Sequence, residues 1–316
     1  TLSLHDALPI WDPHSSREER AAGPRYRIQY QAAPFMLAAE EALLGAGVDL
    51  LYSAQVSGAV VQGDQVQGVI IETKRGRRQL AGRCFVDATG DADLLFFAGE
   101  RTHDDPTNRR TGWYFSYNGK DVKLHQQTDP IDSAIPADSR LYSGTDIEEV
   151  SQHCIDMHRM ILAHNLRLRS EQDPDAYPLL IPAFHGLRMT RRLDGVFAFS
   201  EDLHEGIWFE DAIGMIGNWK KRGCRYTLPY RTICAPSLRN LYAAGRCTCA
   251  DKSGWDLTRV IPSCAVTGEA AGLAAALQVK LGQRPSFSTV QEKLVEQGAL
   301  LDETLFRMKQ RVSDTL

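Results

Sequence analysis

The chain has 316 residues, of which 43% are hydrophobic and 24% are charged, close to the averages of soluble globular domains. Its formal net charge of -4 gives no basis for a nucleic-acid or anionic-membrane partner, and no run approaches the roughly 18 apolar residues of a membrane-spanning helix. The 7 cysteines are odd in number and too sparse for a disulfide scaffold, which favours a reducing, cytoplasmic location. These features predict a soluble α/β enzyme and say nothing about its oligomeric state.

The first 24 residues give little information about the fold. Residues 1–10 match one reading frame of a common sequencing-library adapter, residue for residue, and we interpret them as a scar of DNA assembly. The alternative is a short amphipathic start of the natural protein. Residues 11–24 are polar, so we expect 1–24 to be adapter-derived or disordered, and the chain to be an N-terminally truncated fragment.

Regular elements are predicted from residue 32 onward. Phe35, Met36 and Ala39 begin an apolar pattern at helical spacing, and the turn residues Gly63 and Asp64 separate two alternating runs as in a β-hairpin. In chain order we expect a helix at 32–45, strands at 48–52, 53–61, 65–73, 79–81 and 83–88, and a helix at 93–99.

The middle of the chain differs in character. Residues 112–120 alternate with aromatics as strands do. Residues 146–170 read as a helix, and the segment 144–148 offers an N-cap and an acidic first turn. The expected buried face of this helix carries Val150, Cys154, Met157, Ile161 and Leu162. We therefore predict a discontinuous layout: a first part of a nucleotide-binding domain at 25–100, an inserted α+β substrate or cap domain at 101–237, a second part at 238–282, and a helical segment at 283–316.

Two distant segments look like halves of one site. Residues 84–93 and 240–247 each begin as a short apolar run and stop in small residues, as a buried strand ends in a tight turn. Small residues let the backbone approach a ligand closely, and ligands of open α/β sheets sit beyond the carboxyl ends of the strands. The pattern predicts a nucleotide cofactor at this place.

These segments resemble the FAD-dependent oxidoreductase family, flavoproteins with two dinucleotide-binding domains. The likeness rests on Asp-Ala-Thr-Gly-Asp at 87–91, Asn-Leu-Tyr-Ala-Ala-Gly-Arg-Cys at 240–247, Arg-Val-Ile-Pro-Ser-Cys at 259–264 and Gly-Glu-Ala-Ala-Gly at 268–272. It covers most of residues 25–282 and implies a FAD/NAD(P)-binding Rossmann-like domain. The family's Gly-X-Gly-X-X-Gly fingerprint, which cradles the FAD pyrophosphate, does not occur in the sequence.

The resemblance implies which residues contact FAD. Pro262 suits the first turn of a helix whose free N–H groups and positive dipole end would face the flavin; the alternative is an ordinary buried Ala-rich helix. Arg246 is open between a phosphate contact and an ion pair with Asp251 or Asp256. The full set of expected cofactor-binding residues is Val56, Ala88, Thr89, Gly90, Asp91, Gly245, Arg246, Pro262, Ser263, Cys264 and Gly268.

Candidate substrate residues lie in the predicted insert. Arg188, Arg191 and Arg192 form a basic cluster that can grip a carboxylate, and family analogy places Tyr230 and Arg231 near the active site. The alternative for the arginines is a solvated surface paired with acidic residues. We take Arg188, Arg191, Tyr230 and Arg231 as the catalytic candidates.

The expected activity is hydride transfer between a small organic substrate and flavin N5. One alternative is a flavin-fold scaffold without turnover. Another is a thiol- or metal-dependent enzyme that uses Cys247 and Cys249, although Cys-X-Cys lacks the spacing of common zinc or dithiol sites and no metal site is predicted. Without the pyrophosphate fingerprint, the 316-residue chain itself is expected to bind FAD weakly and to be inactive.

Overall fold

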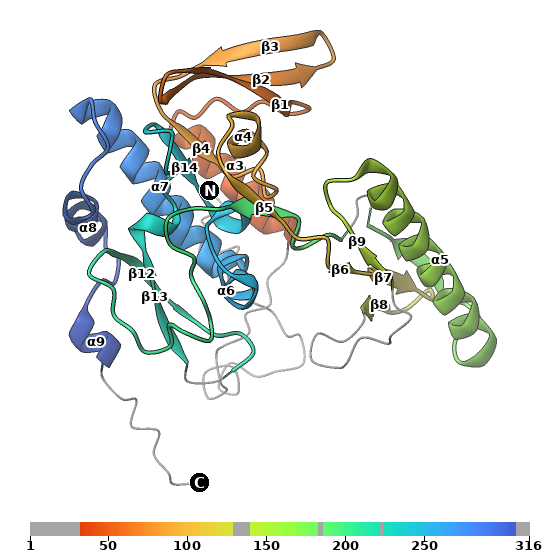
Figure 1. Ribbon diagram of the computed structural model, residues 1–316. Coiled ribbons are helices and arrows are strands. Elements are labelled where there is room, and N and C mark those ends of the chain that lie inside the picture. The colour runs from red at the N-terminus through yellow and green to blue at the C-terminus, as the bar shows by residue number, and fades with distance from the viewer. Residues whose placement is uncertain (1–31, 129–139, 183–185, 222–223, 308–316) are drawn as a thin grey trace, which may run out of the picture.

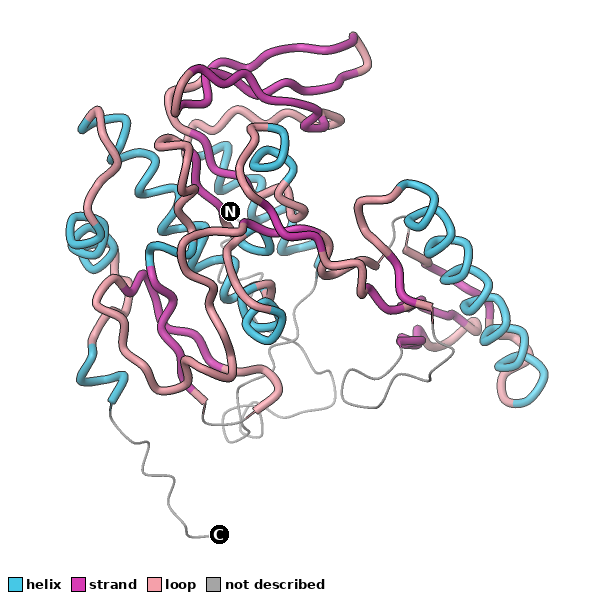
Figure 2. The backbone as a smooth tube through the Cα atoms, viewed as in Figure 1, coloured by secondary structure: helices cyan, strands magenta, loops and turns pink. Residues whose placement is uncertain are grey.

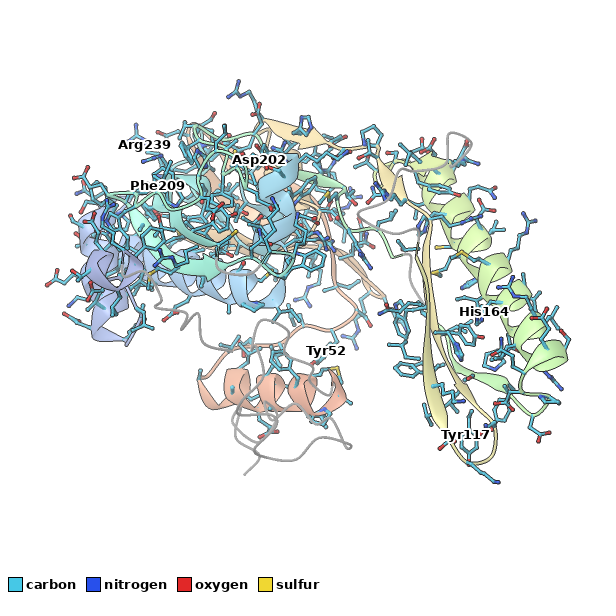
Figure 3. All side chains as sticks on the ribbon, turned by 90° about the horizontal axis from the view of Figure 1, so that it is seen from below. Tyr52, Tyr117, His164, Asp202, Phe209 and Arg239 are labelled. Atoms are coloured by element: carbon cyan, nitrogen blue, oxygen red, sulfur yellow. The ribbon has the colours of Figure 1, made fainter. Side chains whose placement is uncertain are left out.

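The computed structural model describes residues 32–128, 140–182, 186–221 and 224–307. These residues form a main body around the long helix α7 (Ile261–Leu281) and a separate lobe built on helix α5 (Ile147–Glu171) (Figures 1 and 2). In Figure 3 the labelled Tyr117 and His164 lie in the lobe, whereas Asp202, Phe209 and Arg239 lie in the body. The predicted segment 1–24, and the end of the C-terminal segment at 308–316, lie outside the described residues.

The part of the body that positions the site is a parallel pair of short strands. Strand β4 (Phe85–Asp87) pairs with β14 (Leu241–Ala243) in parallel, with Phe85 opposite Leu241 and Asp87 opposite Ala243. Their carboxyl ends therefore lie side by side, as expected for a Rossmann-like sheet. The helices α7 and α4 (Asp93–Phe97) contact this pair, and the 3-10 turn η2 (Gly245–Cys247) and the helix α6 (Lys252–Thr258) follow β14 in the chain.

An antiparallel three-stranded sheet precedes this pair in the chain. Its order is β1-β2-β3, and Gly63 and Asp64 form the two-residue turn between β1 and β2, with Gly63 at φ 60. The predicted hairpin is confirmed. The bounds are β1 (Gln55–Gln62), β2 (Gln65–Thr73) and β3 (Gly76–Ala81), and the helix before them is α3 (Ala32–Gly45).

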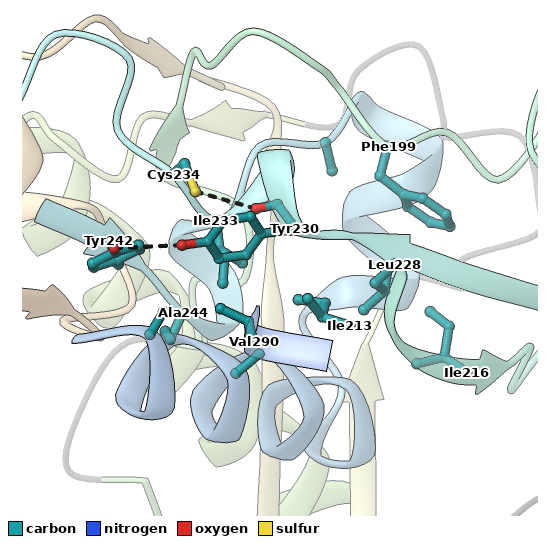
Figure 4. Close-up of a cluster of buried hydrophobic side chains, with 14 of the residues drawn as sticks. Phe199, Ile213, Ile216, Leu228, Tyr230, Ile233, Cys234, Tyr242, Ala244 and Val290 are labelled. Atoms are coloured by element: carbon teal, nitrogen blue, oxygen red, sulfur yellow. Dashed lines mark hydrogen bonds between the residues drawn. The ribbon is translucent and has the colours of Figure 1, made fainter. Parts of the chain in front are cut away.

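The largest core lies where α7 meets the antiparallel pair β12 (Ala212–Gly217) and β13 (Arg225–Pro229). It includes Tyr242 and Ile213, which Figure 4 labels, and also Trp255; all three are at most 2% exposed. The helix α8 (Phe287–Glu296) adds Val290 and Leu294 to it. The remaining elements of the body are β5 (Thr102–Asp104), β11 (Arg191–Leu193), η1 (Tyr230–Thr232) and α9 (Glu303–Arg307).

The lobe packs one face of α5 on a small antiparallel sheet. Asp146 caps α5, since its side chain accepts hydrogen bonds from the backbone N–H groups of Glu148 and Glu149, as predicted. The buried residues of α5 recur every four positions along one face: His153, Met157, Ile161 and Asn165. The other elements of the lobe are β6 (Asn108–Arg109), β7 (Thr111–Tyr117), β8 (Val122–Thr128), β9 (Leu141–Tyr142) and β10 (Tyr177–Leu180).

Two local predictions are wrong. Residues 48–52 form no strand, because no neighbouring strand pairs with them and Leu51 and Tyr52 are exposed at 60% and 74%. Leu162 of α5 is 58% exposed, because it lies one residue beyond the buried face that Met157 and Ile161 define. The predicted domain boundaries remain a prediction.

Two wider properties concern membranes and metals. In the described part of the chain, no single helix combines the length and apolarity needed to cross a membrane; only α6 and α7 taken together do so, and they are bent by 85°. Among the described residues there is also no group of three or more His, Cys, Asp or Glu side chains arranged to hold a metal ion.

Candidate functional site

The turn after β4, residues 87–93, is fixed by the carboxylate of Asp87, which is 1% exposed. Its Oδ1 accepts hydrogen bonds from the backbone N–H and the hydroxyl of Thr89, at 3.0 and 2.7 Å, and its Oδ2 accepts one from the N–H of Leu95 at 2.9 Å. A buried carboxylate is tolerated only when such donors satisfy it. Asp87 thus fixes the start of the 87–93 turn, where Ala88 and Thr89 are exposed.

The thiol of Cys247 joins this turn to the end of β14. Its sulfur accepts hydrogen bonds from the N–H groups of Gly90 and Ala92, both at 3.3 Å, and donates to Asp87 Oδ1 at 3.6 Å. Burial and the neighbouring Asp87 carboxylate raise the pKa of Cys247, so the thiol keeps its proton. The hydrogen bond between the N–H of Ala92 and Cys247 also holds Ala92 in a left-handed conformation, at φ 54, that a non-glycine residue adopts only under constraint.

Arg246 bridges the two halves of the site. Its Nε donates to the carbonyl of Gly90 at 2.8 Å and its Nη2 donates to Asp91 at 3.0 Å. A Cβ on Gly90 would lie 2.6 Å from Arg246 Nη2, so only glycine fits there. The predicted ion pair of Arg246 with Asp251 or Asp256 is wrong. The partner of Arg246 is Asp91, which is adjacent in space because β4 and β14 are paired.

A second arginine holds the other end of the turn. Arg191 donates from Nε to the carbonyl of Asp91 at 2.9 Å and from Nη2 to Asp93 at 2.6 Å, and it lies over the ring of Phe96. Burial raises the pKa of Asp93 more strongly than Arg191 lowers it. Because its Nε and Nη2 are bonded in this way and its side chain is only 8% exposed, Arg191 is a structural clamp in this conformation.

The second wall of the site consists of Gly245 and the start of α7. Gly245 has φ 62, its N–H donates to Thr267 at 2.9 Å, and a Cβ there would lie 3.3 Å from the sulfur of Cys264. The hydroxyl of Thr267 bonds back to the carbonyls of Ser263 and Cys264. Gly245 is therefore locked against the first turns of α7.

The N-terminus of α7 suits an anionic or electron-rich ligand. No side chain caps it, Pro262 occupies its first turn, and Val260 at its N-cap cannot accept a side-chain hydrogen bond. Pro262 is exposed, and a Cβ on Gly268 would meet no atom within 4 Å. The free N–H groups and the positive end of the helix dipole thus face outward, with room beside them.

The expected cofactor-binding residues therefore converge, except for one. Those of the 87–93 turn, of η2 and of the α7 N-terminus lie at the carboxyl ends of the two parallel strands. Val56 lies apart in β1, where it is paired with Ile71 and packs against the core beside α4.

The candidate substrate residues do not form one group. Tyr230 is 7% exposed and its hydroxyl contacts that of Tyr242 at 3.4 Å, inside the main core (Figure 4). Burial strongly raises the pKa of Tyr230. Arg231 is paired with Asp211 at 2.6 Å. Tyr230 and Arg231 support the core in this conformation, whereas Arg188 is exposed and has no side-chain hydrogen bond to the described residues.

Sequence reasoning assigned no role to Asp87, Asp93 or Thr267. Asp87 stands first in the motif at 87–91, which was a usable signal, but its contact with Cys247 joins residues 160 positions apart. The roles of Asp93 and Thr267 likewise depend on contacts that only the folded chain brings together.

The chain matches a known protein family. A family model described as FAD dependent oxidoreductase matches residues 12–112 and 100–296. The chain belongs to this family. Its fold is accordingly α/β with a FAD/NAD(P)-binding Rossmann-like domain, as the sequence indicated, and FAD is its cofactor. No curated protein matches the chain.

Several solved structures resemble it weakly overall. A geranylgeranyl bacteriochlorophyll reductase-like protein from Thermoplasma acidophilum is 12% identical, with a TM-score of 0.42 over 90% of this chain and 68% of its own. The aromatic hydroxylase CabE of angucycline biosynthesis is 15% identical, with a TM-score of 0.37 over 90% of this chain. The myxobacterial chondrochloren halogenase CndH is 15% identical, with a TM-score of 0.40 over 89% of this chain. The chain spans 55% of CabE and 59% of CndH.

Proposed function

We propose that this FAD-dependent oxidoreductase transfers a hydride between a small organic substrate and N5 of the flavin. The observation that carries the proposal is the meeting of the 87–93 turn and η2 at the carboxyl ends of the paired strands β4 and β14, where Arg246 and Cys247 join them. The bound flavin would supply the hydride chemistry.

The residues of the chain would hold and orient the cofactor. Gly245 and Gly90 permit close backbone approach, and the uncapped N-terminus of α7 favours negative charge beside it. The rigid bonds of Asp87, Arg191 and Arg246 keep this surface in one geometry, which is what a positioning site requires.

A thiol-dependent reaction has less support. Burial is the main cause that raises the pKa values of both Cys247 and Cys249, and the reactive form of cysteine is the thiolate. All seven cysteines are free, which is consistent with the cytoplasmic location that we infer.

The test is FAD binding followed by reduction. The 316-residue chain, and the same chain joined to any in-frame coding sequence found upstream of it in its genome, are titrated with FAD and monitored by flavin absorbance and fluorescence. We expect the 316-residue chain to bind FAD weakly, because it has no Gly-X-Gly-X-X-Gly motif, and an extended chain that has the motif to bind FAD tightly. Bleaching of the flavin bands by an organic donor without air supports turnover.

A matched pair of variants ties the result to the site. Gly245→Ala, which forces a Cβ to φ 62 beside Cys264, should weaken FAD binding, whereas Gly217→Ala, which meets no atom within 4 Å, should not. Tight binding that no donor ever bleaches would favour a scaffold, and the absence of FAD binding by both chains would overturn the proposal.

A further inference from the structure

Two neighbouring arginines of β11 are in opposite situations. Successive residues of a strand point to opposite faces. The side chain of Arg191 is bonded to the 87–93 turn, whereas no hydrogen bond or ion pair joins the side chain of Arg192 to any described residue. The Nε of Arg192 is buried without an acceptor among the described residues. Its guanidinium lies over the indole of Trp255, 5.4 Å from the ring centroid and so within the reach of about 6 Å at which a cation is attracted to an aromatic face.

The carboxylates near Arg192 are already engaged by other groups. Asp251 accepts from the N–H of Gly254 at 2.7 Å as the N-cap of α6. Asp194 faces Arg101 at 3.8 Å. Asp105 accepts from the N–H of Thr107 at 3.0 Å and faces Lys252 at 3.9 Å. These acids lie within electrostatic range of Arg192, yet none of them bonds to it.

Trp255 connects Arg192 to the cofactor wall. The side chain of Trp255 is fully buried, and its Nε1 donates to the backbone carbonyl of Arg246 at 2.8 Å. The guanidinium therefore lies on a buried indole of α6 that is hydrogen-bonded directly to η2. A half-buried cation without a hydrogen-bond partner is unfavourable in free energy. A planar guanidinium held on an indole is oriented to bind an anion with two coplanar oxygens.

We propose that Arg192 binds a carboxylate of the substrate, so that the substrate class of this oxidoreductase is a small organic acid. The inference rests on the proposed function, which supplies the neighbouring FAD site. Among the three clustered arginines, Arg191 is occupied, and Arg188 is exposed with its positive neighbour Arg259 nearby. Arg188 shares the lack of a side-chain bond, but of the three arginines Arg192 is the one whose Nε is buried without a partner among the described residues and whose guanidinium lies over an indole.

The test uses sodium benzoate as the carboxylate probe and benzamide as its neutral analogue. Saturation-transfer NMR titrations of the 316-residue chain, without FAD, measure the Kd of each. We expect benzoate to bind and benzamide not to bind. Arg192→Gln should weaken benzoate binding about tenfold or more, and Arg192→Lys should weaken it less, because a charge-assisted bond is lost in the first and partly kept in the second.

The matched control removes a positive charge elsewhere. Arg159→Gln changes an arginine of α5 whose side chain is 74% exposed, and it should leave the Kd of benzoate unchanged. Equal binding of benzamide, an unchanged Kd in Arg192→Gln, or inorganic phosphate binding more tightly than benzoate would each overturn the carboxylate assignment. The last outcome would point to a phosphate of the cofactor as the anion.

A second measurement needs no variant and decides the question if Arg192→Gln does not fold. Phenylglyoxal modification of the wild-type chain is mapped by peptide mass spectrometry, with and without benzoate. Protection of Arg192 by benzoate and not by benzamide supports the proposal, and equal modification in both overturns it. If neither the 316-residue chain nor the extended chain binds FAD but benzoate still binds, the proposed function alone is contradicted. If FAD binds and benzoate does not, this inference alone is contradicted.

Discussion

Around β4, polar bonds join segments from distant parts of the sequence, whereas the lobe on α5 packs around a small buried cluster whose members lie within 47 residues of one another. The 87–93 turn is bonded by Arg191, 98 residues from its partner Asp93, and by Arg246, 155 residues from Asp91. The lobe's buried cluster consists of Tyr114, Met157 and Ile161. The comparison indicates that the turn should break as part of the whole body, while the lobe should open on its own.

The largest expected effect is that of Asp87→Ala. The change leaves the N–H group of Leu95 without an acceptor in a buried place and removes the acceptor of the Thr89 N–H and hydroxyl. It should lower the free energy of unfolding of the body by about 3 kcal/mol. Asp87→Asn should also be destabilising, because its amide NH₂ must replace one of two oxygens that both accept from N–H groups. Urea denaturation followed by circular dichroism measures both.

Asp202→Ala is the control for this prediction. Asp202 is an exposed aspartate of the same body, so its loss should change the free energy of unfolding by less than about 0.5 kcal/mol. If Asp87→Ala changed the free energy of unfolding as little as Asp202→Ala, the turn would not be held by its polar bonds. The difference that we infer between the body and the lobe would then be wrong.

The second prediction concerns the lobe. Met157→Ala removes a side chain that is 1% exposed and leaves a cavity between α5 and β7, which should cost the lobe about 2–3 kcal/mol. Hydrogen exchange resolved by peptide should speed up in α5 and β7 and stay unchanged in β4 and β14. Ile155→Ala, at a position on α5 that is 45% exposed, should change neither. Faster exchange in β4 would show that the lobe and the body unfold together.

The sequence predicted those elements whose causes are local. The helix at 32–45, the hairpin around Gly63 and the N-cap at Asp146 depend on neighbours within a few residues, and all three are confirmed. The strand at 48–52 failed because a strand needs a partner, which the apolar pattern alone does not provide.

The same distinction applies to the site. The motifs at 87–91 and 240–247 were sufficient to identify the family, because they depend on residue types and order. The sequence could not predict the partner of Arg246 or the different contacts of Arg191 and Arg192. Two adjacent arginines are equivalent in a sequence pattern, and only the strand directs one to Asp93 and the other to Trp255. Sequence patterns therefore located the two walls, and only the fold shows how they are joined.

The smallest expected effect is a pH dependence that belongs to the lobe. His164 Nδ1 is hydrogen-bonded to Tyr114 at 2.7 Å, and His125 Nε2 to Ser116 at 2.8 Å. Burial lowers the pKa values of both histidines, and the charge of His164 lowers that of His125 further. The unfolded lobe therefore binds protons before the folded lobe does, so its stability should be complete above about pH 7 and decrease as the pH falls through about 6.5 toward 5.

Hydrogen exchange of α5 and β7, corrected for the intrinsic effect of pH, should show this loss between pH 7.5 and 5. The double variant His125→Gln/His164→Gln should flatten the dependence in the lobe, whereas His103→Gln, at an exposed position of β5, should leave it unchanged. The body should respond separately, because burial also lowers the pKa of His204, which lies against Phe197 outside the lobe. A lobe that becomes more stable on acidification would contradict the sign derived from its two histidines, since protonation would then be favoured by the folded state.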